Sequence, residues 1–502
     1  MAKKLLVIAM LFLLLKSNNS GSDMKIESPP LNEKSFKNYF AKDLKFSTKN
    51  VTFQDLLKSP GSDWLVYHGD YQATHYSPLP EINRENIKNL VVKWTFNITD
   101  APNLRSSPIV HNGIMYVTVA NEVQALDAET GQWLWRWQAY KERSKGINRG
   151  VAIYENKLFF STSDCRLVAL NKMTGDLIWS TQYATSGQGQ RYFSTMAPLV
   201  TKDRVVMGVG NHNDGEGGFI VAFSVSDGKE LWRFRALPPA SSLHGAPTWL
   251  TGSYDPATDI VYWAIGTLPD RQRSNPESYL PNAYHDSIVA LNAKDGRLKW
   301  SVRLNKQLPM DWDPNEPLIL TEVNNRKVIL LADRNGIFYS IDRISGQIIS
   351  TNPFVKEIEW NSKKRLCPSI RGATNWMPPS LSPITRLVYV TTLEGCAGED
   401  NPFIIKAIDS ASLKIKWSYF TRGTNVAAPG LLATAGNIVF GSEGSGHVVA
   451  IDAVNGKKLW DFGTGRAIFG APVSYSLNHR QYISIVAGSD VYTFGLHKPA
   501  AK

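Results

Sequence analysis

Short runs of alternating apolar and polar residues fill most of the chain, and one eleven-residue pattern recurs in seven copies. The clearest copy is ALDAETGQWLW (125–135), which has an apolar lead-in, a turn with Asp and Gly, and an outgoing run ending in Trp. The other copies are residues 169–179, 222–232, 290–300, 340–350, 407–417 and 450–460. Alternation is typical of β-strands, and Asp and Gly favour the tight turn of a hairpin. Each copy therefore predicts two antiparallel strands joined by a turn.

The spacing of the copies predicts the architecture. The copies start roughly 45–70 residues apart, which leaves room for about four strands each, the size of a propeller blade. A Trp at the end of each hairpin is too large to stay exposed in blade after blade, so we expect it to pack between neighbouring sheets. Only the fifth copy departs, because it ends in Ser350. The chain is therefore predicted to be an all-β propeller with tryptophan-docking repeats.

One more blade has to be assembled from the two ends of the repeat region. Residues 90–98 (LVVKWTFNI) form a strand without a local repeat partner, and the strands around 470–495 lack a closing Trp. Pairing the first strand with the last closes the ring and removes exposed strand edges. Seven repeats and this composite blade predict an eight-bladed β-propeller, and we expect residues 61–498 to form one domain.

The N-terminal residues differ from the repeats. Residues 1–23 begin with a basic stretch and continue into an apolar run at 5–15, the layout of a signal peptide. A membrane helix needs about 20 apolar residues, so 1–23 is predicted to be a signal peptide or N-terminal anchor, with no other membrane span. The protein is thus expected to be exported, to the periplasm of a bacterium. Residues 24–60 are expected to be a polar, loosely packed lead-in, and 61–88 to pack on the propeller.

Charge and cysteine content narrow the possible functions. The formal net charge is +11, but the Lys and Arg residues are scattered, which argues against a nucleic-acid partner. We expect a solvated basic surface; a face for an acidic partner, such as an electron acceptor or an anionic membrane, is the alternative. Of the three cysteines, Cys165, Cys367 and Cys396, two can pair in an exported protein. Cys165 stands among apolar residues and is expected to be a buried free thiol. The sequence has no Cys-x-x-Cys-His motif, so no c-type haem is expected.

Four connections are longer than a plain blade needs and hold most of the unusual residues: 181–218, 233–287, 301–338 and 351–404. Long loops on a rigid scaffold commonly carry function. Motifs along the chain, some of them in these connections, include INRGVA (147–152), MDWDPNEP (310–317), DRNGIFYSIDR (333–343) and CPSIRGATNWMPPSLSP (367–383). With these motifs the chain resembles the quinoprotein alcohol dehydrogenases, which bind pyrroloquinoline quinone (PQQ) and a calcium or lanthanide ion in an eight-bladed propeller. The resemblance implies PQQ-dependent oxidation of an alcohol or sugar hydroxyl, with electrons passed to a separate acceptor, a cytochrome or a quinone.

The resemblance assigns the chemistry to two charged side chains. Asp313 matches the family's catalytic base, which takes the hydroxyl proton, and a carboxylate near a divalent ion is suited to that role. Arg334 matches the residue that contacts the quinone oxygens and stabilises developing negative charge. Taken from the residues alone, Asp313 could instead cap a turn, because Asp-Pro often starts turns.

Further positions match contacts to the quinone. Arg149 matches a residue that pairs with a PQQ carboxylate, which a planar guanidinium meets with two hydrogen bonds. Thr195 matches a hydroxyl contact and Asn375 another polar contact. Trp249 matches the Trp on which the flat cofactor stacks, although a propeller Trp also serves as core.

The metal ligands are the least regular part of the resemblance. Asn213 stands where the methanol dehydrogenase pattern has a Glu ligand and Thr267 where it has an Asn, and Asp214 and Asp313 complete the predicted set. Neutral oxygens bind calcium, although fewer carboxylates lower the affinity. The membrane-bound glucose dehydrogenases resemble this arrangement. Asn315 stands where lanthanide-dependent members have a second Asp, which favours Ca²⁺ over a lanthanide. The alternative is a polar turn without a metal.

Two departures leave the substrate open. Where the family often has adjacent cysteines over the cofactor, this chain has Arg143 and Ser144, and a second pocket Trp is replaced near Ala428. Cys367 and Cys396, in contrast, match a family disulfide. Two alternatives remain: a non-catalytic propeller that binds a protein, like the outer-membrane assembly lipoproteins with similar repeats, and a decayed homologue that keeps the fold without the quinone.

Overall fold

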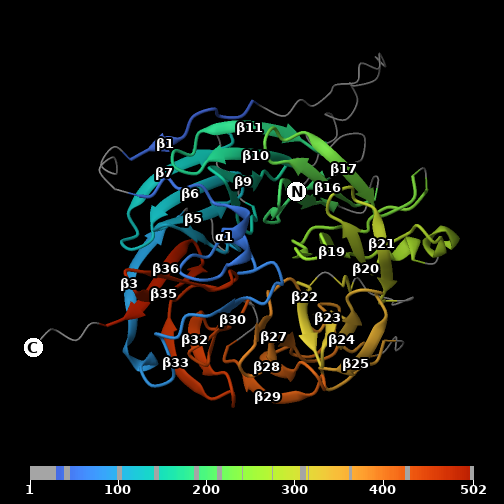
Figure 1. Cartoon of the computed structure of the whole chain (residues 1–502). Coiled ribbons are helices and arrows are strands. Elements are labelled where there is room, and N and C mark those ends of the chain that lie inside the picture. Colours follow the sequence, from blue (N-terminus) through green and yellow to red (C-terminus); the bar gives the residue numbers. More distant parts are fainter. Residues whose placement is uncertain are drawn as a thin grey trace, which may run out of the picture.

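A computed structural model describes residues 30–38, 46–98, 104–140, 146–185, 192–211, 217–239, 241–273, 275–305, 312–314, 316–360, 365–423 and 430–497. In this part of the chain, eight sheets of four or five strands stand around a central axis (Figure 1). The eight-bladed, all-β propeller predicted from the repeats is confirmed.

Seven blades are built from strands that follow one another along the chain, starting with a short innermost strand. Blade 1 consists of β4 (Ile109–His111), β5 (Ile114–Val119), β6 (Glu122–Asp127) and β7 (Trp133–Gln138). Blade 2 consists of β8 (Ala152–Tyr154), β9 (Lys157–Ser161), β10 (Arg166–Asn171) and β11 (Leu177–Gln182). Blade 3 consists of β13 (Leu199–Thr201), β14 (Arg204–Gly208), β16 (Phe219–Ser224) and β17 (Glu230–Arg235). A two-stranded ribbon, β12 (Tyr192–Phe193) and β15 (Gly210–Asn211), lies within blade 3's connections.

Blades 4 to 7 repeat this order. Blade 4 consists of β18 (Ser253–Asp255), β19 (Ile260–Ile265), β20 (Ser287–Asn292) and β21 (Leu298–Arg303). Blade 5 consists of β22 (Ile319–Val323), β23 (Arg326–Ala332), β24 (Ile337–Asp342) and β25 (Ile348–Pro353). Blade 6 consists of β26 (Ser380–Ser382), β27 (Leu387–Leu393), β28 (Phe403–Asp409) and β29 (Ile415–Phe420), and blade 7 of β30 (Leu432–Thr434), β31 (Ile438–Glu443), β32 (His447–Asp452) and β33 (Lys458–Gly463). The 3₁₀ turns η3 (Asp270–Gln272) and η4 (Pro276–Tyr279) lie in the long connection within blade 4.

Blade 8 closes the ring as predicted. Its inner strands are β34 (Val473–Leu477), β35 (Arg480–Ala487) and β36 (Asp490–Leu496), and its outer strand is β3 (Leu90–Asn97), from the start of the repeat region. β3 pairs antiparallel with β36, from Leu90 opposite Leu496 to Asn97 opposite Asp490. The first and last strands are thus joined, and the short 3₁₀ turn η2 (Ile87–Asn89) leads into the joint.

The repeated Trp residues pack against the turn of the following blade. In the turn of blade 1, Asp127 accepts hydrogen bonds from the Thr130 and Glu129 amides, and Gly131 has a φ of +75°. A Cβ on Gly131 would lie 2.6 Å from the Trp94 ring, so only glycine permits this close approach. The same contact recurs for Trp135–Gly175, Trp179–Gly228, Trp232–Gly296, Trp300–Gly346 and Trp417–Gly456.

The exception in the repeats has a structural counterpart. Blade 5 ends in Ser350 instead of Trp, and the turn that follows it in blade 6 has Leu413 where the others have Gly. Leu413 keeps the left-handed backbone, with a φ of +57°, and its carbonyl accepts a hydrogen bond of 2.9 Å from Asn352. The Trp and the Gly are therefore lost together, because each is needed only for the other.

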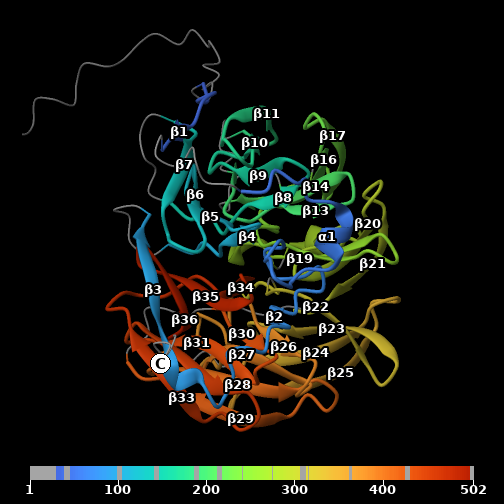
Figure 2. The same cartoon turned by 60° about the vertical axis from the view of Figure 1, so that its left-hand side comes forward.

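The segment before the repeats crosses the ring and pairs with innermost strands, as Figure 2 shows for the blue chain. The carbonyls of Tyr71, Gln72 and Thr74 accept hydrogen bonds from β18, β22 and β26. β2 (Tyr76–Ser77) then adds in parallel to β30. Because these innermost strands would otherwise expose unpaired backbone groups toward the axis, this segment protects their edges. It packs on the propeller, as predicted.

The expectation of loose packing is wrong for residues 51–57. Val51 pairs its backbone with Glu155 in blade 2, and α1 (Phe53–Leu57) follows directly, with Leu56 buried. Thr52 and Asp55 form a capping box, which satisfies amides at the start of this short helix. β1 (Phe36–Lys37) also pairs with β7, so the lead-in is tied to the outside of blade 1.

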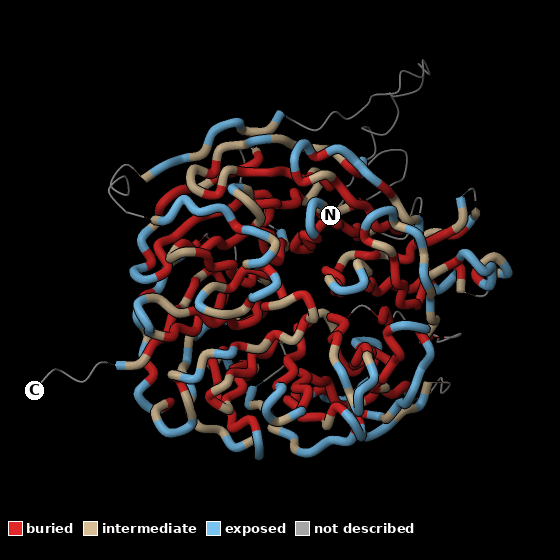
Figure 3. The backbone as a smooth tube through the Cα atoms, viewed as in Figure 1, coloured by how far each residue is buried: buried red, intermediate tan, exposed pale blue. Residues whose placement is uncertain are grey.

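Burial follows the blade architecture (Figure 3). The inner strands and the segments that lead into them are buried, whereas outer strands such as β25 and the hairpin turns are exposed. Among the described residues, no helix has the length and apolar character needed to cross a membrane. The predicted signal peptide or anchor at 1–23 lies outside the described residues.

Candidate functional site

Residues predicted for the site occupy equivalent places in successive blades. Five of them stand three to six residues before an innermost strand: Arg149 before β8, Thr195 before β13, Trp249 before β18, Asp313 before β22 and Asn375 before β26. Because the innermost strands surround the axis, the segments that lead into them converge on one face of the ring. In an antiparallel blade, the loop between the second and third strands lies on that same face. Those loops supply Thr267 and Arg334.

A cavity of about 850 Å³ opens on this face. The predicted residues that line it are Arg149, Thr195, Trp249, Thr267 and Asp313. The other lining residues are Arg105, Ile147, Phe193, Asn211, Pro247, Leu268, Pro269, Asp270, Arg271 and Arg273. Four arginines and two aspartates give the lining a net positive charge. Residues that are far apart in the sequence are thus brought together in a cationic cavity.

Asp313 is held in place from two blades. Its Oδ1 accepts a hydrogen bond of 2.7 Å from the Thr267 amide in blade 4. The preceding Trp312 is buried and donates from its indole to the Ser369 carbonyl, at 3.2 Å. A Cβ on Gly266 would lie only 2.6 Å from Asp313 Oδ1, so glycine is needed for this approach. The carboxylate is therefore fixed at the cavity wall before any ligand binds.

Arg334 lies behind this carboxylate. Its Nη1 is 3.9 Å from Asp313 Oδ2, and its side chain is buried. Two further buried carboxyl groups are close by in sequence, Glu316 and Asp333. Burial raises the pKa of Glu316 well above its usual range and that of Asp333 to about 8, so both favour the protonated form at neutral pH. Of these three groups, Asp313 is the one with a recorded ion pair to Arg334.

Arg149 is a buried cation with a hydroxyl and an indole around it. Its Nη1 donates to Thr195 Oγ1 at 2.7 Å and to the Thr195 carbonyl at 3.1 Å. Its guanidinium carbon is 4.8 Å from the centre of the Trp249 ring. Burial lowers the pKa of Arg149 to about 10, so it stays charged at neutral pH. Among the described residues no carboxylate pairs with it, so its positive charge has no neutralising partner there.

The one remaining predicted contact to the quinone is Asn375. Asn375 is not a lining residue; its Oδ1 accepts a hydrogen bond of 2.9 Å from the amide of Trp376. The Trp376 ring in turn lies 5.2 Å from the Arg149 guanidinium carbon. Asn375 is therefore placed to orient an aromatic wall, one step away from the lining itself.

Only half of the predicted metal set can be placed. Asn213 and Asp214 lie outside the described residues, whereas Thr267 and Asp313 are in contact at the cavity wall. Thr267 Oγ1 is 3.2 Å from Asp286 Oδ2, which also lies 2.7 Å from His285 Nδ1. Thr267 and Asp313 offer the hard oxygen donors that calcium accepts.

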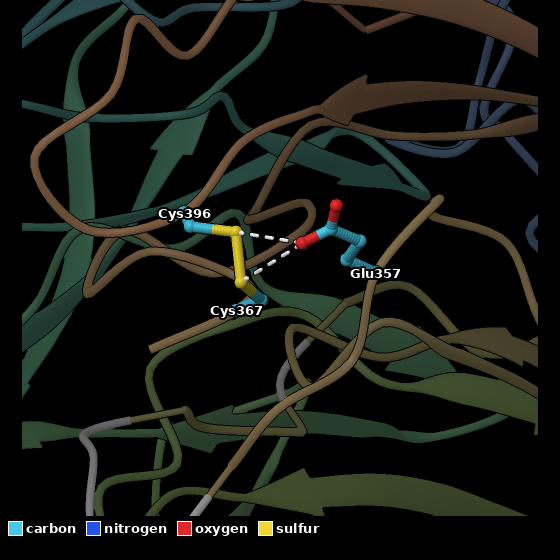
Figure 4. Close-up of side chains that lie close together, drawn as sticks. All are labelled: Glu357, Cys367 and Cys396. Carbon is cyan, nitrogen blue, oxygen red and sulfur yellow. Dashed lines mark hydrogen bonds between the residues drawn. A yellow bond between two sulfur atoms is a disulfide. The ribbon is translucent and has the colours of Figure 1, made fainter. Parts of the chain in front are cut away.

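Cys367, in the long connection after blade 5, forms a disulfide with Cys396, in the loop between β27 and β28 of blade 6 (Figure 4). The Glu357 carboxylate lies 3.7 and 3.6 Å from the two sulfurs. Among the described residues, this trio is the one cluster of cysteine, histidine and acidic side chains close enough to hold a metal ion. Because the sulfurs are bonded to each other, they offer no thiolate ligand. Cys165 is a buried free thiol, in the turn between β9 and β10.

The sequence analysis missed several lining residues, among them Arg105, Phe193 and Asn211. Arg105 stands four residues before β4, the place in blade 1 that Arg149 and Thr195 occupy in blades 2 and 3. This equivalence was a usable signal, because the repeats fix where each innermost strand begins. Asn211 lies in β15, two residues before Asn213, the predicted metal ligand.

Two protein-family models match this chain, and together they span residues 64–498. Residues 64–354 match the PQQ family model, described as the glucose/ethanol/alcohol dehydrogenase β-propeller domain. Residues 285–498 match the model of the outer membrane protein assembly factor BamB. The first match includes every blade that contributes Arg149, Thr195, Trp249 and Asp313, whereas the second runs from the outer strands of blade 4 to the end of blade 8.

Similar individual proteins include quinoprotein and quinohemoprotein alcohol dehydrogenases. The chain is 30% identical to the quinoprotein alcohol dehydrogenase PedH of Pseudomonas putida, over 87% of this chain and 88% of the relative. It is 29% identical to the quinohemoprotein alcohol dehydrogenase ADH IIB of Pseudomonas putida, over 85% of this chain and 74% of the relative. Among solved structures, the quinohemoprotein alcohol dehydrogenase ADHIIG of Pseudomonas putida superimposes with a TM-score of 0.81 at 26% identity, covering 91% of this chain and 84% of that one.

Proposed function

The chain belongs to the PQQ family of glucose, ethanol and alcohol dehydrogenase β-propellers, and on that premise we propose that it is a PQQ-dependent dehydrogenase. It oxidises an alcohol or sugar hydroxyl and passes the electrons to a separate acceptor. The observation that carries the proposal is that one cavity is lined by both Arg149 and Asp313. Among the described residues, Arg149 is a buried cation without a carboxylate partner, and Asp313 is a carboxylate fixed by the Thr267 amide.

The residues of the cavity fit the quinone. PQQ is a flat, fused-ring molecule with carboxylate groups, and Trp249 offers an indole face while Arg149 offers a guanidinium fork. Thr195 Oγ1, already bonded to Arg149, keeps that fork oriented and can itself contact the ligand. When bound, PQQ supplies the acceptor for the two electrons that leave the substrate carbon.

The protein's own share of the chemistry is proton removal and charge stabilisation. Asp313 takes the hydroxyl proton, because a carboxylate can act as a general base and the Thr267 amide fixes this one at the cavity wall. Arg334, 3.9 Å behind it, balances the negative charge of the site while the proton is in transit. Glu316 and Asp333, which favour their protonated forms, add little competing charge.

We further propose that Ca²⁺ binds beside Asp313. Asp313 and Thr267 would supply a carboxylate and a hydroxyl, with Asn213 and Asp214 completing the set, and these are oxygen donors of the kind calcium prefers. A lanthanide is the less favoured choice, because Asn315 offers no second charge for a trivalent ion. The electron acceptor is proposed to be a cytochrome or a quinone, and the protein to be exported to the periplasm.

The test is reconstitution. The purified apoprotein is incubated with PQQ and Ca²⁺, and turnover of a panel of primary alcohols, secondary alcohols and sugars is followed with an artificial electron-accepting dye. The proposal predicts uptake of one PQQ per chain and dye reduction that depends on both PQQ and substrate. Absence of PQQ uptake would contradict it and favour a propeller without the quinone. Uptake without turnover on any hydroxyl compound would contradict the dehydrogenase assignment alone.

A further inference from the structure

Arg105 is a second cation of the cavity, and it was not predicted from the sequence. It lines the cavity, four residues before β4. Its guanidinium carbon lies 4.8 Å from the centre of the Trp376 ring and 5.5 Å from that of Phe469. Burial lowers the pKa of Arg105, yet its Nε has no hydrogen-bond partner among the described residues. The side chain is thus held by aromatic rings and not by an opposite charge.

Arg105 and Arg149 share one aromatic ring. The Arg149 guanidinium carbon lies 5.2 Å from the centre of the Trp376 ring, on which Arg105 also lies. The charge of Arg105 adds to the lowering of the Arg149 pKa, which indicates that the two cations repel each other. Two like charges in a partly desolvated space are costly unless an anion sits between or beside them.

Other cations of this face have partners. Arg273 is 2.9 Å from Asp270 and donates from Nε to the Leu268 carbonyl. Arg334 lies 3.9 Å from Asp313. Within the described part of the chain, neither Arg105 nor Arg149 forms an ion pair with a carboxylate. The arrangement of two cations and an indole is complementary to a flat molecule that carries two negative groups.

We propose that Arg105 and Arg149 form a clamp for two carboxylates of one ligand, with Trp376 between them, and that Arg105 is a binding residue for the second carboxylate. The inference rests on the proposed function, because the ligand it favours is the quinone: both guanidinium groups lie on one ring, so both anions belong to a single flat molecule. A carboxylate on the substrate is the other source of the same chemistry, and the test separates the two.

The test measures binding of PQQ to the apoprotein by quenching of tryptophan fluorescence, independently of turnover. Arg105→Ala is expected to raise the Kd for PQQ at least tenfold, Arg105→Lys less, and Arg105→Glu more than Arg105→Ala. Arg297→Ala, which removes an exposed arginine paired with Asp295, is the matched control and is expected to leave the Kd within twofold. Near-UV circular dichroism of each variant checks that the fold is kept.

A second arm uses the trimethyl ester of PQQ, in which the carboxylates are masked. The clamp predicts that parent and Arg105→Ala bind the ester with similar Kd, because the lost contact needs the free acid. Equal Kd of parent and Arg105→Ala for PQQ itself, with Arg149→Ala weakened, would overturn the clamp and leave the proposed function standing. A parent that binds no PQQ would overturn both.

The third arm addresses the source of the anion. The dye-linked kcat/KM of Arg105→Ala is compared with the parent for a neutral alcohol and for a hydroxy acid of similar size, at saturating PQQ and Ca²⁺. If the ratio of variant to parent kcat/KM is similar for both substrates, the result supports the quinone as the clamped molecule. A loss confined to the hydroxy acid, with the Kd for PQQ unchanged, would overturn that assignment in favour of a substrate carboxylate.

Discussion

The two faces of the ring use the same repeat in opposite ways. On the face of the hairpin turns, nearly every blade does the same thing: a Trp of one blade covers the turn glycine of the next, as Trp300 covers Gly346. On the cavity face, equivalent places hold a different residue in each blade, from Arg105 in blade 1 to Asp313 in blade 5. The repeat thus carries stability where it is kept, and departures from it carry chemistry.

Removing the disulfide tests whether the connection after blade 5, on the way to the cavity face, needs a covalent link for its stability. Replacing both Cys367 and Cys396 with Ser releases a loop closed over a separation of 29 residues. Chain entropy predicts a loss of about 3–4 kcal/mol in the free energy of unfolding. Chemical unfolding of the double variant and the parent measures it. Equal unfolding midpoints would show that strands and core, without the disulfide, already hold this connection.

Removing a cavity cation is expected to affect binding and not stability. Arg149→Ala loses a charge-assisted contact, for which about 1.5–3 kcal/mol corresponds to a rise of ten- to a hundredfold in the Kd for PQQ. Its thermal unfolding midpoint should stay near that of the parent or rise, since a buried charge is removed. Fluorescence titration and a thermal melt give the two numbers. An unchanged Kd would remove Arg149 from the site.

On the face of the hairpin turns, a substitution is expected to lower stability and to leave PQQ binding unchanged. In Gly346→Ala the new Cβ would lie 2.5 Å from Trp300, and Gly346 has a φ of +76°. Gly465→Ala is the matched control, because Gly465 has a φ of +68° and nothing within 4 Å of its added Cβ. We expect Gly346→Ala to be less stable than the control by about 1–3 kcal/mol, with PQQ affinity unchanged. Equal stabilities of the two variants would refute the docking role.

The segment before the repeats, which crosses the ring, carries buried histidines. Burial lowers the pKa of His75 to about 3, below the value of about 6.5 of an unfolded chain. Stability contributed by the neutral ring is therefore complete above pH 6.5 and is lost as the pH falls toward the folded pKa, by about 1–2 kcal/mol between pH 7 and 5. Burial raises the pKa of Asp70 to about 6, which acts in the opposite sense.

The histidine effect is isolated by difference. Urea unfolding of the parent and of His75→Gln is measured at pH 7 and at pH 5, with the exposed His479→Gln as control. The stability of His75→Gln should depend less on pH than that of the parent, by about 1–2 kcal/mol over this interval. An identical pH dependence in parent and His75→Gln would mean that His75 titrates normally in the folded protein.

The two faces also differ in how much the sequence predicts. The eight blades, the closure by β3 and the Trp docking follow from the repeat, because one local pattern occurs often enough to reveal its partner. The cavity residues do not repeat: Arg149 and Asp313 were proposed through a family resemblance, and Arg105 was missed altogether. What brings them together is the convergence of segments from distant blades, a property of the closed ring that no local stretch contains.

The central claim is that the cavity is catalytic, and Asp313→Asn tests it most directly. The amide is isosteric and its oxygen can still accept the hydrogen bond from the Thr267 amide, but it cannot take a proton. Parent and variant, both loaded with PQQ and Ca²⁺, are compared for bound PQQ and dye-linked turnover. The account predicts near-parental PQQ content, and turnover lower by about 10²–10⁴-fold, the usual contribution of a general base. Parental turnover in Asp313→Asn would contradict it.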